Sequence, residues 1–217
     1  VTYGYDTSGR FNFLGGGGQT FAYGYATNSQ LIATVTNSAL NYTDSRVYDA
    51  AHDSINQRKT TWGATPVIKA QFDYTQDNLG RITDTAKTGE VFNRYGNGTQ
   101  GLDTFYGYDD RSQVTSEVTK LGGSSTVLTG RNDAYAWDNI GNRTSLTHNG
   151  NTATYTANAL NQYTQRTVSA FFDVAGASTQ STVTVSKTGG PTDTATRHGN
   201  YFFDAYGLSN TSNPVFA

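Results

Sequence analysis

One short pattern recurs along this chain of 217 residues: an aromatic residue followed by Asp, two variable residues, Gly and Arg. Its clearest copy is Tyr5-Asp6-Thr7-Ser8-Gly9-Arg10, and looser copies surround Asp77 and Asp138. A chain that repeats one small unit builds a surface from its copies, because a single unit is too small to bury its own apolar face. The repeat therefore predicts an array of similar elements, and it predicts a scaffold before it predicts a catalyst.

The copies are placed by their acidic position, which we call the anchor. The anchors are Asp6, Ala26, Asp53, Asp77, Asp109, Asp138 and Asn158, followed by a degenerate copy within residues 201–208 at Asp204. Neighbouring anchors are separated by 20 residues (Asp6 to Ala26) up to 46 residues (Asn158 to Asp204), which excludes a solenoid of rigid repeat length. The spread fits hairpins with loops of variable length. No Pro-rich segment or charge run divides the chain, so we expect one continuous array over residues 1–217.

Each copy is predicted to be a strand, a turn and a second strand. Before most anchors, aromatic side chains alternate with small ones, as in Phe21-Ala22-Tyr23-Gly24-Tyr25, which is typical of a strand with one bulky face. The Asp or Asn then closes a turn by accepting a hydrogen bond from its own backbone two residues on, and Gly supplies the backbone freedom. The turn residues predicted in this way are Asp6, Gly9, Asp53, Asp77, Gly80, Asp109, Asp138, Gly141 and Asn158.

The aromatic residues near the turns are expected to lie on one face of the sheet. Stacked between neighbouring repeats, they would form a ladder that replaces an aliphatic core, and we favour this packing role over stacking on a ligand. The predicted ladder consists of Tyr5, Tyr25, Tyr74, Tyr108, Trp137 and Tyr155.

The composition favours an all-β fold. The chain has 15 Tyr, 11 Phe, 24 Gly and only 3 Pro, while Met is absent. Frequent Thr and Tyr suit a half-buried pleated sheet, and no window of the sequence has a convincing helical period. Cysteine is also absent, which excludes disulfides and thiolate metal sites. A chain without oxidisable residues fits a secreted or cell-surface bacterial protein.

Several function classes receive no support from the residues. The net charge of −2 gives no electrostatic reason to expect a nucleic acid partner, and no apolar run approaches the length of a membrane span. The histidines, His52, His148 and His198, share no metal-ligand spacing and are expected to be solvated loop residues. No serine lies in a Gly-x-Ser-x-Gly elbow. We therefore expect no catalytic residue, cofactor or metal, and a hydrolase built on the sheet is only a third alternative.

The repeated motif resembles the YD repeat of the Rhs family. Relatives in that family include bacterial polymorphic toxin shells, cocoon-forming subunits of Tc toxins and the teneurins. The resemblance covers Tyr3 to about Tyr163 and weakens beyond it. It implies antiparallel hairpins in a twisted sheet that spirals into a hollow shell or tube wall, often around a toxic C-terminal segment. This chain has fewer repeats than a closed shell needs and no recognisable toxin domain.

These observations predict a structural, non-catalytic protein that forms the wall of an extracellular shell, tube or filament. The chain starts at Val1 and not at Met, which predicts a processed product or an excised piece. Its expected partners are further repeats of a longer parent chain or identical copies, because an array of strands leaves an unpaired edge at each end. The parent is expected to enclose a toxin segment. The alternative is a cell-surface adhesin or a module that binds carbohydrate or protein through exposed aromatic residues.

Overall fold

The computed structural model describes residues 1–96, 101–167 and 170–208, and its elements are almost all antiparallel β-strands. The all-β, antiparallel fold class predicted from the sequence is confirmed. The chain divides into two compact units, Val1–Asn93 and Arg94–Ala217, which are described separately. The single array over 1–217 stays a prediction.

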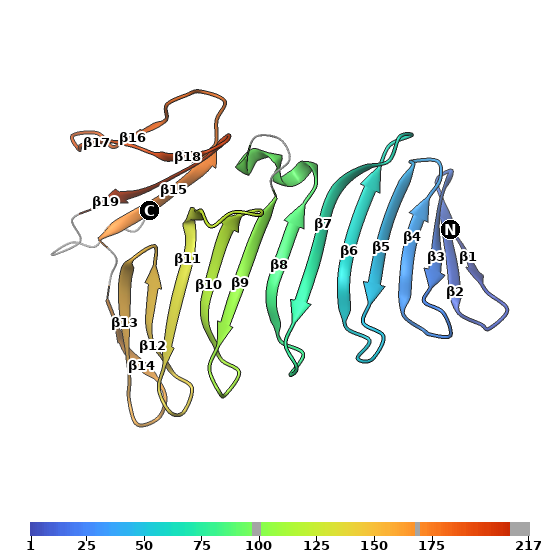
Figure 1. Cartoon of the computed structure of the whole chain (residues 1–217), viewed down its shortest axis with the longest axis horizontal. Helices are drawn as coiled ribbons and strands as arrows, with labels where there is room; N and C mark the ends of the chain where they lie inside the picture. The colour runs from blue at the N-terminus through green and yellow to red at the C-terminus, as the bar shows by residue number, and fades with distance from the viewer. Residues whose placement is uncertain (97–100, 168–169, 209–217) are drawn as a thin grey trace. The chain divides into compact units, whose positions relative to one another are not determined.

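Unit 1 is a meander in which each strand pairs with the next one along the chain (Figure 1). A short 3-10 helix, η1 (Glu90–Tyr95), begins after the last strand, and Phe92 packs edge-on against Phe72 with ring centres 5.7 Å apart. The strands are β1 (Thr2–Tyr5), β2 (Phe11–Gly16), β3 (Gln19–Tyr25), β4 (Ile32–Asn37), β5 (Tyr42–Tyr48), β6 (Ile55–Trp62), β7 (Val67–Gln76) and β8 (Ile82–Thr88).

The register gives unit 1 two chemically different faces. Directly paired residues of antiparallel strands lie on the same face, and alternate residues of one strand lie on opposite faces. Pairs such as Tyr23 with Val35 and Arg58 with Phe72 therefore assign the sides. The aromatic face carries Phe21, Tyr23, Tyr42, Trp62, Phe72 and Tyr74. The opposite face, which we call the small-residue face, carries Thr20, Ala22, Gly24, Thr34, Thr36 and Thr43, together with Phe13.

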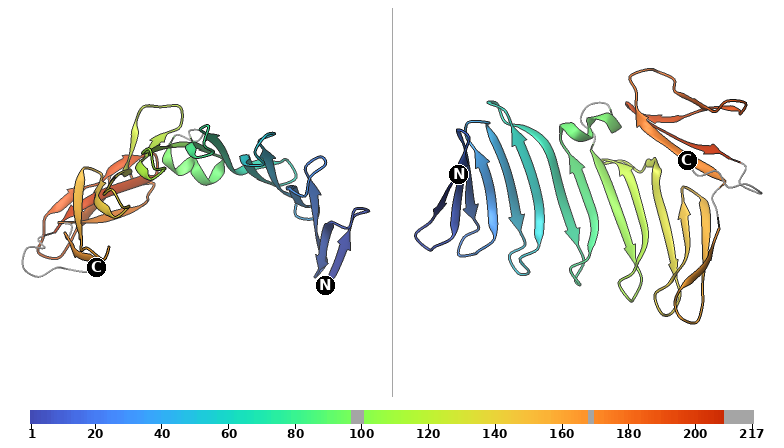
Figure 2. Two further views of the ribbon diagram at one scale, coloured as in Figure 1. Left: turned by 90° about the horizontal axis from the view of Figure 1, so that it is seen from below. Right: turned by 180° about the vertical axis from the view of Figure 1, so that it is seen from behind.

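Unit 1 is a single layer without an apolar core. Within residues 1–93, all of which the structure describes, the side chains that are buried belong to Asn37, Asp44 and Thr85. Large apolar side chains there are half-buried or exposed, and the strands lie edge-on as one layer in the left view of Figure 2. Lateral contacts between strands must therefore supply most of the stability of this unit.

Unit 2 begins with a second meander and ends with two small sheets (Figure 1). The meander strands are β9 (Leu102–Tyr108), β10 (Val114–Leu121), β11 (Val127–Trp137), β12 (Arg143–His148), β13 (Asn151–Ala157) and β14 (Tyr163–Arg166). A three-stranded sheet has the order β15 (Phe171–Ala177), β19 (Tyr201–Gly207) and β18 (Thr196–His198). A two-stranded ribbon pairs β16 (Thr184–Ser186) with β17 (Thr192–Thr194).

The three-stranded sheet gives unit 2 an apolar core. Tyr201 of β19 is buried, and its hydroxyl donates to the carbonyl oxygen of Thr129 in β11 at 3.0 Å. The ring of Phe203 lies against Gly130 of the same strand. The described apolar residues of unit 2 that are buried are Leu102, Leu128, Ala153, Ala195, Tyr201, Phe203 and Tyr206. The C-terminal sheet therefore lies against the meander at β11.

The region predicted as a degenerate repeat, residues 201–208, is β19 and not a turn hairpin. Asp204 lies inside that strand, and its Oδ2 atom is buried without a hydrogen-bond partner in the described structure. Burial and the nearby charge of Asp193 raise the pKa of Asp204. Asp204 therefore makes no turn of the kind seen at the other anchors.

Substitutions at Gly130 and Gly150 distinguish the cost of lost packing from the cost of backbone strain. Both have φ of 86°, but a Cβ at Gly130 would lie 2.4 Å from Phe203, whereas nothing lies within 4 Å of a Cβ at Gly150. We expect Gly150→Ala to cost about 1–2 kcal/mol of strain in the left-handed region. Gly130→Ala should cost a further ~1–3 kcal/mol, because the Phe203 ring must move. Urea unfolding of both variants measures this, and equal losses would contradict the docking of β19 on β11.

Candidate functional site: the turn-lined edge of the repeats

The motif turns share one hydrogen-bond arrangement. In the first copy, the backbone N–H of Asp6 donates to the Arg10 carbonyl at 2.8 Å, and the N–H of Gly9 donates to the Asp6 carbonyl at 2.9 Å. The Oδ1 atom of Asp6 accepts from the N–H groups of Ser8 and Arg10, both at 2.9 Å. The same set of four bonds recurs at Asp77, Asp109, Asp138 and Asn158.

The last residue of the motif pairs with the second atom of the anchor side chain. Arg81 donates from Nε to Oδ2 of Asp77 at 2.7 Å, and Asn142 donates to Oδ2 of Asp138 at 2.9 Å. Where the anchor is Asn158, the direction reverses, and its Nδ2 donates to Oε1 of Gln162 at 3.1 Å. The side chains at this position, among them Arg10, Arg81, Asn142 and Gln162, are all long or amide-bearing and polar, as this pairing requires.

The turn carboxylates are ionised acceptors. Hydrogen bonds to Asp6, first from the backbone of Arg10, lower the pKa of that carboxyl. At Asp77, burial opposes the shift, but hydrogen bonds from Arg81 and Leu79 outweigh it and lower the pKa. The side-chain hydrogen bond from Asn142 is the main cause of the lowered pKa of Asp138. A general acid needs the opposite shift, so Asp6, Asp77 and Asp138 suit structural turns and are not poised as general acids.

In the third copy the turn carboxylate is that of Asp49, and the prediction of Asp53 for this role is wrong. Oδ1 of Asp49 accepts from the N–H groups of Ala51 and His52, both at 2.9 Å, and its N–H donates to the Ser54 carbonyl at 2.7 Å. Asp53 lies in the same turn with a φ of 55°. The turn is one residue longer than the standard motif. The dipeptide Tyr48-Asp49, which repeats the start of the motif, is the sequence signal for it.

The residue before the anchor reaches back to the preceding repeat, and we call it the pin. Tyr25 donates from its hydroxyl to the Phe11 carbonyl at 2.5 Å, and Tyr48 donates to Ile32 at 2.7 Å. Trp137 donates from Nε1 to the Val114 carbonyl at 2.8 Å. Each acceptor is the first residue of an even-numbered strand in the preceding repeat. Gln76 makes the same contact with Ile55 at 3.3 Å, so a long amide can replace the aromatic pin.

The six predicted ladder residues occupy two different positions. Tyr5, Tyr25, Tyr108 and Trp137 directly precede an anchor, whereas Tyr74 and Tyr155 lie three residues before one. Tyr74 contacts Phe72, and Tyr155 contacts Tyr163, with ring centres 6.4 and 5.6 Å apart. Tyr25 lies beneath the guanidinium of Arg10 at 4.4 Å. Tyr25 and Trp137 each make a pin hydrogen bond to the preceding repeat. The stacking of all six residues as one ladder between repeats stays a prediction.

Neighbouring turns lie side by side at one end of the strands and are also linked by hydrogen bonds. Because a meander reverses direction at every turn, all motif turns of one unit fall at the same end of its strands, the lower end in Figure 1. Arg10 donates to the carbonyl of Ser29 in the next turn at 2.7 Å, and Asn142 donates to Oδ1 of Asn161 at 3.3 Å. In unit 1, shallow hollows separate successive turns, one of about 250 Å³ between the Asp49 and Asp77 turns.

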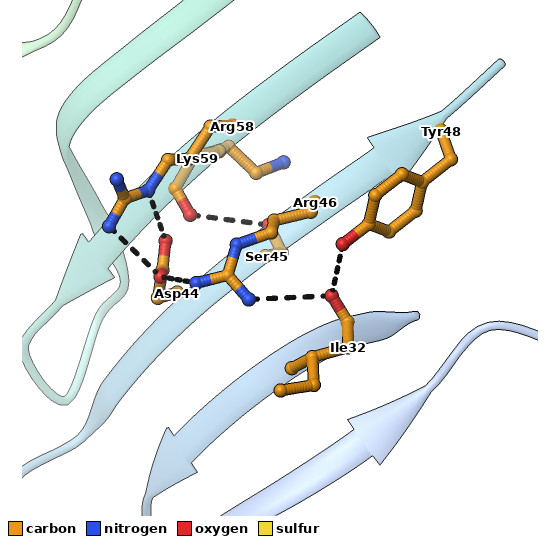
Figure 3. A network of polar contacts seen from close by, with 7 residues as sticks. All are labelled: Ile32, Asp44, Ser45, Arg46, Tyr48, Arg58 and Lys59. Atoms are coloured by element: carbon orange, nitrogen blue, oxygen red, sulfur yellow. Dashed lines mark hydrogen bonds and ion pairs between the residues drawn. The ribbon is translucent and has the colours of Figure 1, made fainter. Parts of the chain in front are cut away.

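A network of polar contacts around a buried carboxylate, that of Asp44, connects neighbouring strands of unit 1 (Figure 3). Asp44 on β5 has only 3% of its surface exposed, and its oxygens accept from Arg46 at 3.1 Å and from Arg58 at 3.2 and 3.3 Å. Hydrogen bonding to Asp44 and its charge raise the pKa of Arg58. Arg46 also donates to the Ile32 carbonyl, which accepts the pin hydrogen bond of Tyr48. The network ties β4, β5 and β6 together and leaves Asp44 without a free oxygen for chemistry.

The histidines differ from the expectation of solvated loops. His52 does lie in an exposed turn beside Asp49, but His148 ends strand β12 and contacts Asp133 and Asp173, and His198 ends β18. Within the described residues, no group of three His, Cys, Asp or Glu side chains is arranged to hold a metal ion. The described part of the chain also contains no helix with the length and apolar character to cross a membrane.

The turn carboxylates are predicted to stabilise the fold. Asp77→Ala removes the acceptor of two backbone N–H groups and should lower the urea midpoint, whereas Asp77→Asn, which imitates Asn158, should retain most of the stability. The pKa of Asp77 is lowered by folding, so its contribution is present at neutral pH and is lost as acid protonates it. The difference from the wild type should therefore shrink below roughly pH 4. Asp110→Ala, at an exposed turn position, is the control.

The pin hydrogen bond is tested by removing single hydroxyl groups. Tyr25→Phe should cost about 0.5–1.5 kcal/mol, because the Phe11 carbonyl loses this donor. Tyr5 occupies the same motif position but precedes the first turn and is 65% exposed, so Tyr5→Phe should stay within about 0.5 kcal/mol of the wild type. Both are measured by chemical unfolding at a concentration that keeps the chain monomeric. A comparable loss of unfolding free energy in both variants would contradict a stabilising role of the pin hydrogen bond.

Comparison with known proteins identifies a fold. No family model matches the sequence, and no curated protein matches it. A solved structure, the crystal structure of TcdB2-TccC3-TEV, a Tc toxin component, matches with a TM-score of 0.56 and 17% sequence identity. The match covers 71% of this chain and 8% of that chain. The chain therefore spans a small part of the length of this structural relative, and the two share a β-fold in the matched region.

Proposed function

We propose that this chain is a structural, non-catalytic segment of a wall built from YD-type repeats, as in an Rhs-type shell, tube or filament. The observation that carries the proposal is the pin, which ties four of the repeats to the preceding one, although the Asn158 repeat has Ala157 at this position. Tyr25, Tyr48 and Trp137 all donate to a backbone carbonyl of the preceding repeat. Such nearest-neighbour contacts can continue over any number of copies. The fold shared with part of a Tc toxin component supports this proposal.

The free edge of β1 supports assembly. Strand β1 has the sequence Thr-Tyr-Gly-Tyr, without the Lys or Pro that protect natural edge strands, and its described pairing is with β2. Tyr5 on this strand occupies a pin position but lies before the first turn. A carbonyl at the start of a strand in a preceding repeat would accept its hydrogen bond. That repeat would come from a longer parent chain or from an identical copy.

The proposal extends to the location of the wall, its assembled shape and the parent chain. The wall would be secreted or displayed on a bacterial cell surface, and it would spiral into a hollow shell or tube in the assembled form. A longer parent would supply the remaining repeats and an enclosed toxin segment. No cofactor is required, since the turn carboxylates and Asp44 are occupied by hydrogen bonds and ion pairs.

A binding module is the second candidate, and one observation favours it. Trp62 on the aromatic face is 50% exposed and lines a hollow of about 550 Å³ together with Gly63 and Lys69. An exposed indole beside a polar side chain suits stacking on a sugar ring or on an aromatic group of a partner protein. Trp62→Ala should abolish such binding and leave assembly unchanged.

Light scattering over a wide concentration range tests the proposal. The mass of the full chain should rise with concentration, and electron microscopy of the same sample should show filaments or closed particles. Tyr3→Lys places a charge on β1, whose Tyr3 side chain is 61% exposed, and should hold the chain as a monomer. Leu79→Lys, at a turn position that is 72% exposed, is the matched control and should assemble. A constant monomer mass for the wild type would exclude self-assembly. Assembly of Tyr3→Lys would exclude the β1 edge as the contact.

A further inference from the structure

His148 joins two sheets of unit 2 through its two ring nitrogens. Nδ1 lies 2.6 Å from Oδ1 of Asp133 on β11, next to the strand β12 that carries the histidine. Nε2 lies 2.9 Å from Oδ2 of Asp173 on β15, a strand of the C-terminal three-stranded sheet. The imidazole, with 24% of its side chain exposed, is therefore a polar bridge between the meander and the sheet that lies against it.

The protonation state decides whether both contacts are favourable. Ionised carboxylates only accept hydrogen bonds, and a neutral imidazole carries a single N–H, so it can donate to one of the two. The imidazolium has two N–H groups and a positive charge. Only the protonated ring therefore attracts the carboxylates of Asp133 and Asp173 at the same time.

Asn149 gives the neutral ring an alternative partner. Its Oδ1 accepts from the backbone N–H of Gly130 at 3.1 Å, which directs its Nδ2 toward the ring. That Nδ2 lies 2.8 Å from Nε2 of His148. The neutral ring can then donate from Nδ1 to Asp133 and accept from Asn149, while Asp173 faces a lone pair. Loss of the proton therefore removes the charge attraction between the sheets and leaves the hydrogen bond inside the meander.

Other charged groups lie on the strands around the ring. Glu117 on β10 lies directly opposite Asp133 in register, so two carboxylates lie together on this part of β10 and β11. Arg131 on β11 is the opposing charge, and it acts to lower the pKa of Tyr201 on β19. Burial is the main cause of the raised pKa of Tyr201, so Tyr201 stays neutral at the pH at which histidine titrates.

We propose that His148 is a pH-sensitive latch, which holds the C-terminal three-stranded sheet on the meander when it is protonated and loosens it when it is neutral. The bond from Tyr201 to Thr129 and the packing of Phe203 on Gly130 do not depend on this proton. The latch therefore shifts the balance between docked and open forms and does not create the docking. Opening would expose the buried Leu128, Tyr201 and Phe203 to a partner.

Hydrogen exchange of the full chain tests the latch. Protection factors, which remove the pH dependence of intrinsic exchange, are measured for β15 and β19 at about pH 5.5 and about pH 8, on either side of the usual histidine pKa. They should fall by about threefold at the higher pH, as expected for one partly exposed ion pair. Strands β2 to β5 of unit 1 serve as the internal reference and should not change. Equal protection of β15 and β19 at both pH values would overturn the proposal.

Two variants assign the effect to the bridge. Asp173→Asn and His148→Gln should each remove the pH dependence in β15 and β19, and Asp173→Asn leaves the contact between His148 and Asp133 in place. His52→Gln is the matched control, because His52 pairs with Asp49 in an exposed turn of unit 1, and it should keep the full pH dependence. If Asp173→Asn retains the threefold change, another group carries it and His148 is not the latch. If the His148→Gln chain fails to fold, the comparison of Asp173→Asn with the wild type still tests whether the bridge carries the pH dependence.

Discussion

Most repeats of the structure depend on one side-chain oxygen, an Oδ1 that accepts two backbone N–H groups of its own turn. It is present at Asp6, Asp49, Asp77, Asp109, Asp138 and Asn158, whereas the turn at Ala26 uses Oγ of Ser29, which accepts from the N–H of Leu31. A tight reversal exposes N–H groups that no strand can pair, and leaving them without a partner is costly. Asp6 and Asp77 supply the missing acceptor in the same way, with distances of 2.9 to 3.0 Å. Once the turn is fixed, the residue before the anchor is held at the end of its strand, where it meets the start of a strand in the preceding repeat. The pin hydrogen bond is thus a consequence of the turn.

This arrangement explains how unit 1 holds together as a single layer. Its buried side chains are polar, and Asp44 shares its charge with Arg46 and Arg58 from its own and the neighbouring strand. A buried ion pair adds little net stability compared with apolar packing, but it penalises any register that separates its members. Hydrogen bonds and charges in such a sheet select the register, while half-buried rings such as Phe72 and Tyr74 supply apolar contact. The stability of the sheet then comes from contacts between adjacent strands, which is the property that an extendable wall needs.

The sequence predicted the parts of the fold that are local. The turns at Asp6, Asp77 and Asp138 could be predicted because the acceptor and its donors lie within four residues of each other. The Asp49 turn is one residue longer, so a fixed spacing selected Asp53 instead. Residues 201–208 carry an aromatic residue, an Asp and a Gly at repeat-like spacing, yet they form β19, because Tyr201 and Phe203 gain more by burial against β11 than a solvated turn would give. The bridge at His148 joins residues from three strands, and no spacing in the sequence signals it.

The direction of the pins bears on how such a wall grows. Every pin donates toward the N-terminal side, from Tyr25 to Phe11, from Tyr48 to Ile32 and from Trp137 to Val114. A repeat is therefore stabilised by the one before it, and Tyr5 is the pin that meets no preceding repeat within this chain. In the meander of unit 2, the corresponding acceptor position in the last strand is the residue that opens β14, which is Tyr163. In the proposed wall, a copy joined head to tail would bring Tyr5 of one chain to the backbone of Tyr163 in the preceding copy and continue the pattern without a new type of contact. Because this contact is heterologous, its rotation angle alone decides whether the repeats close into a shell or continue as a filament.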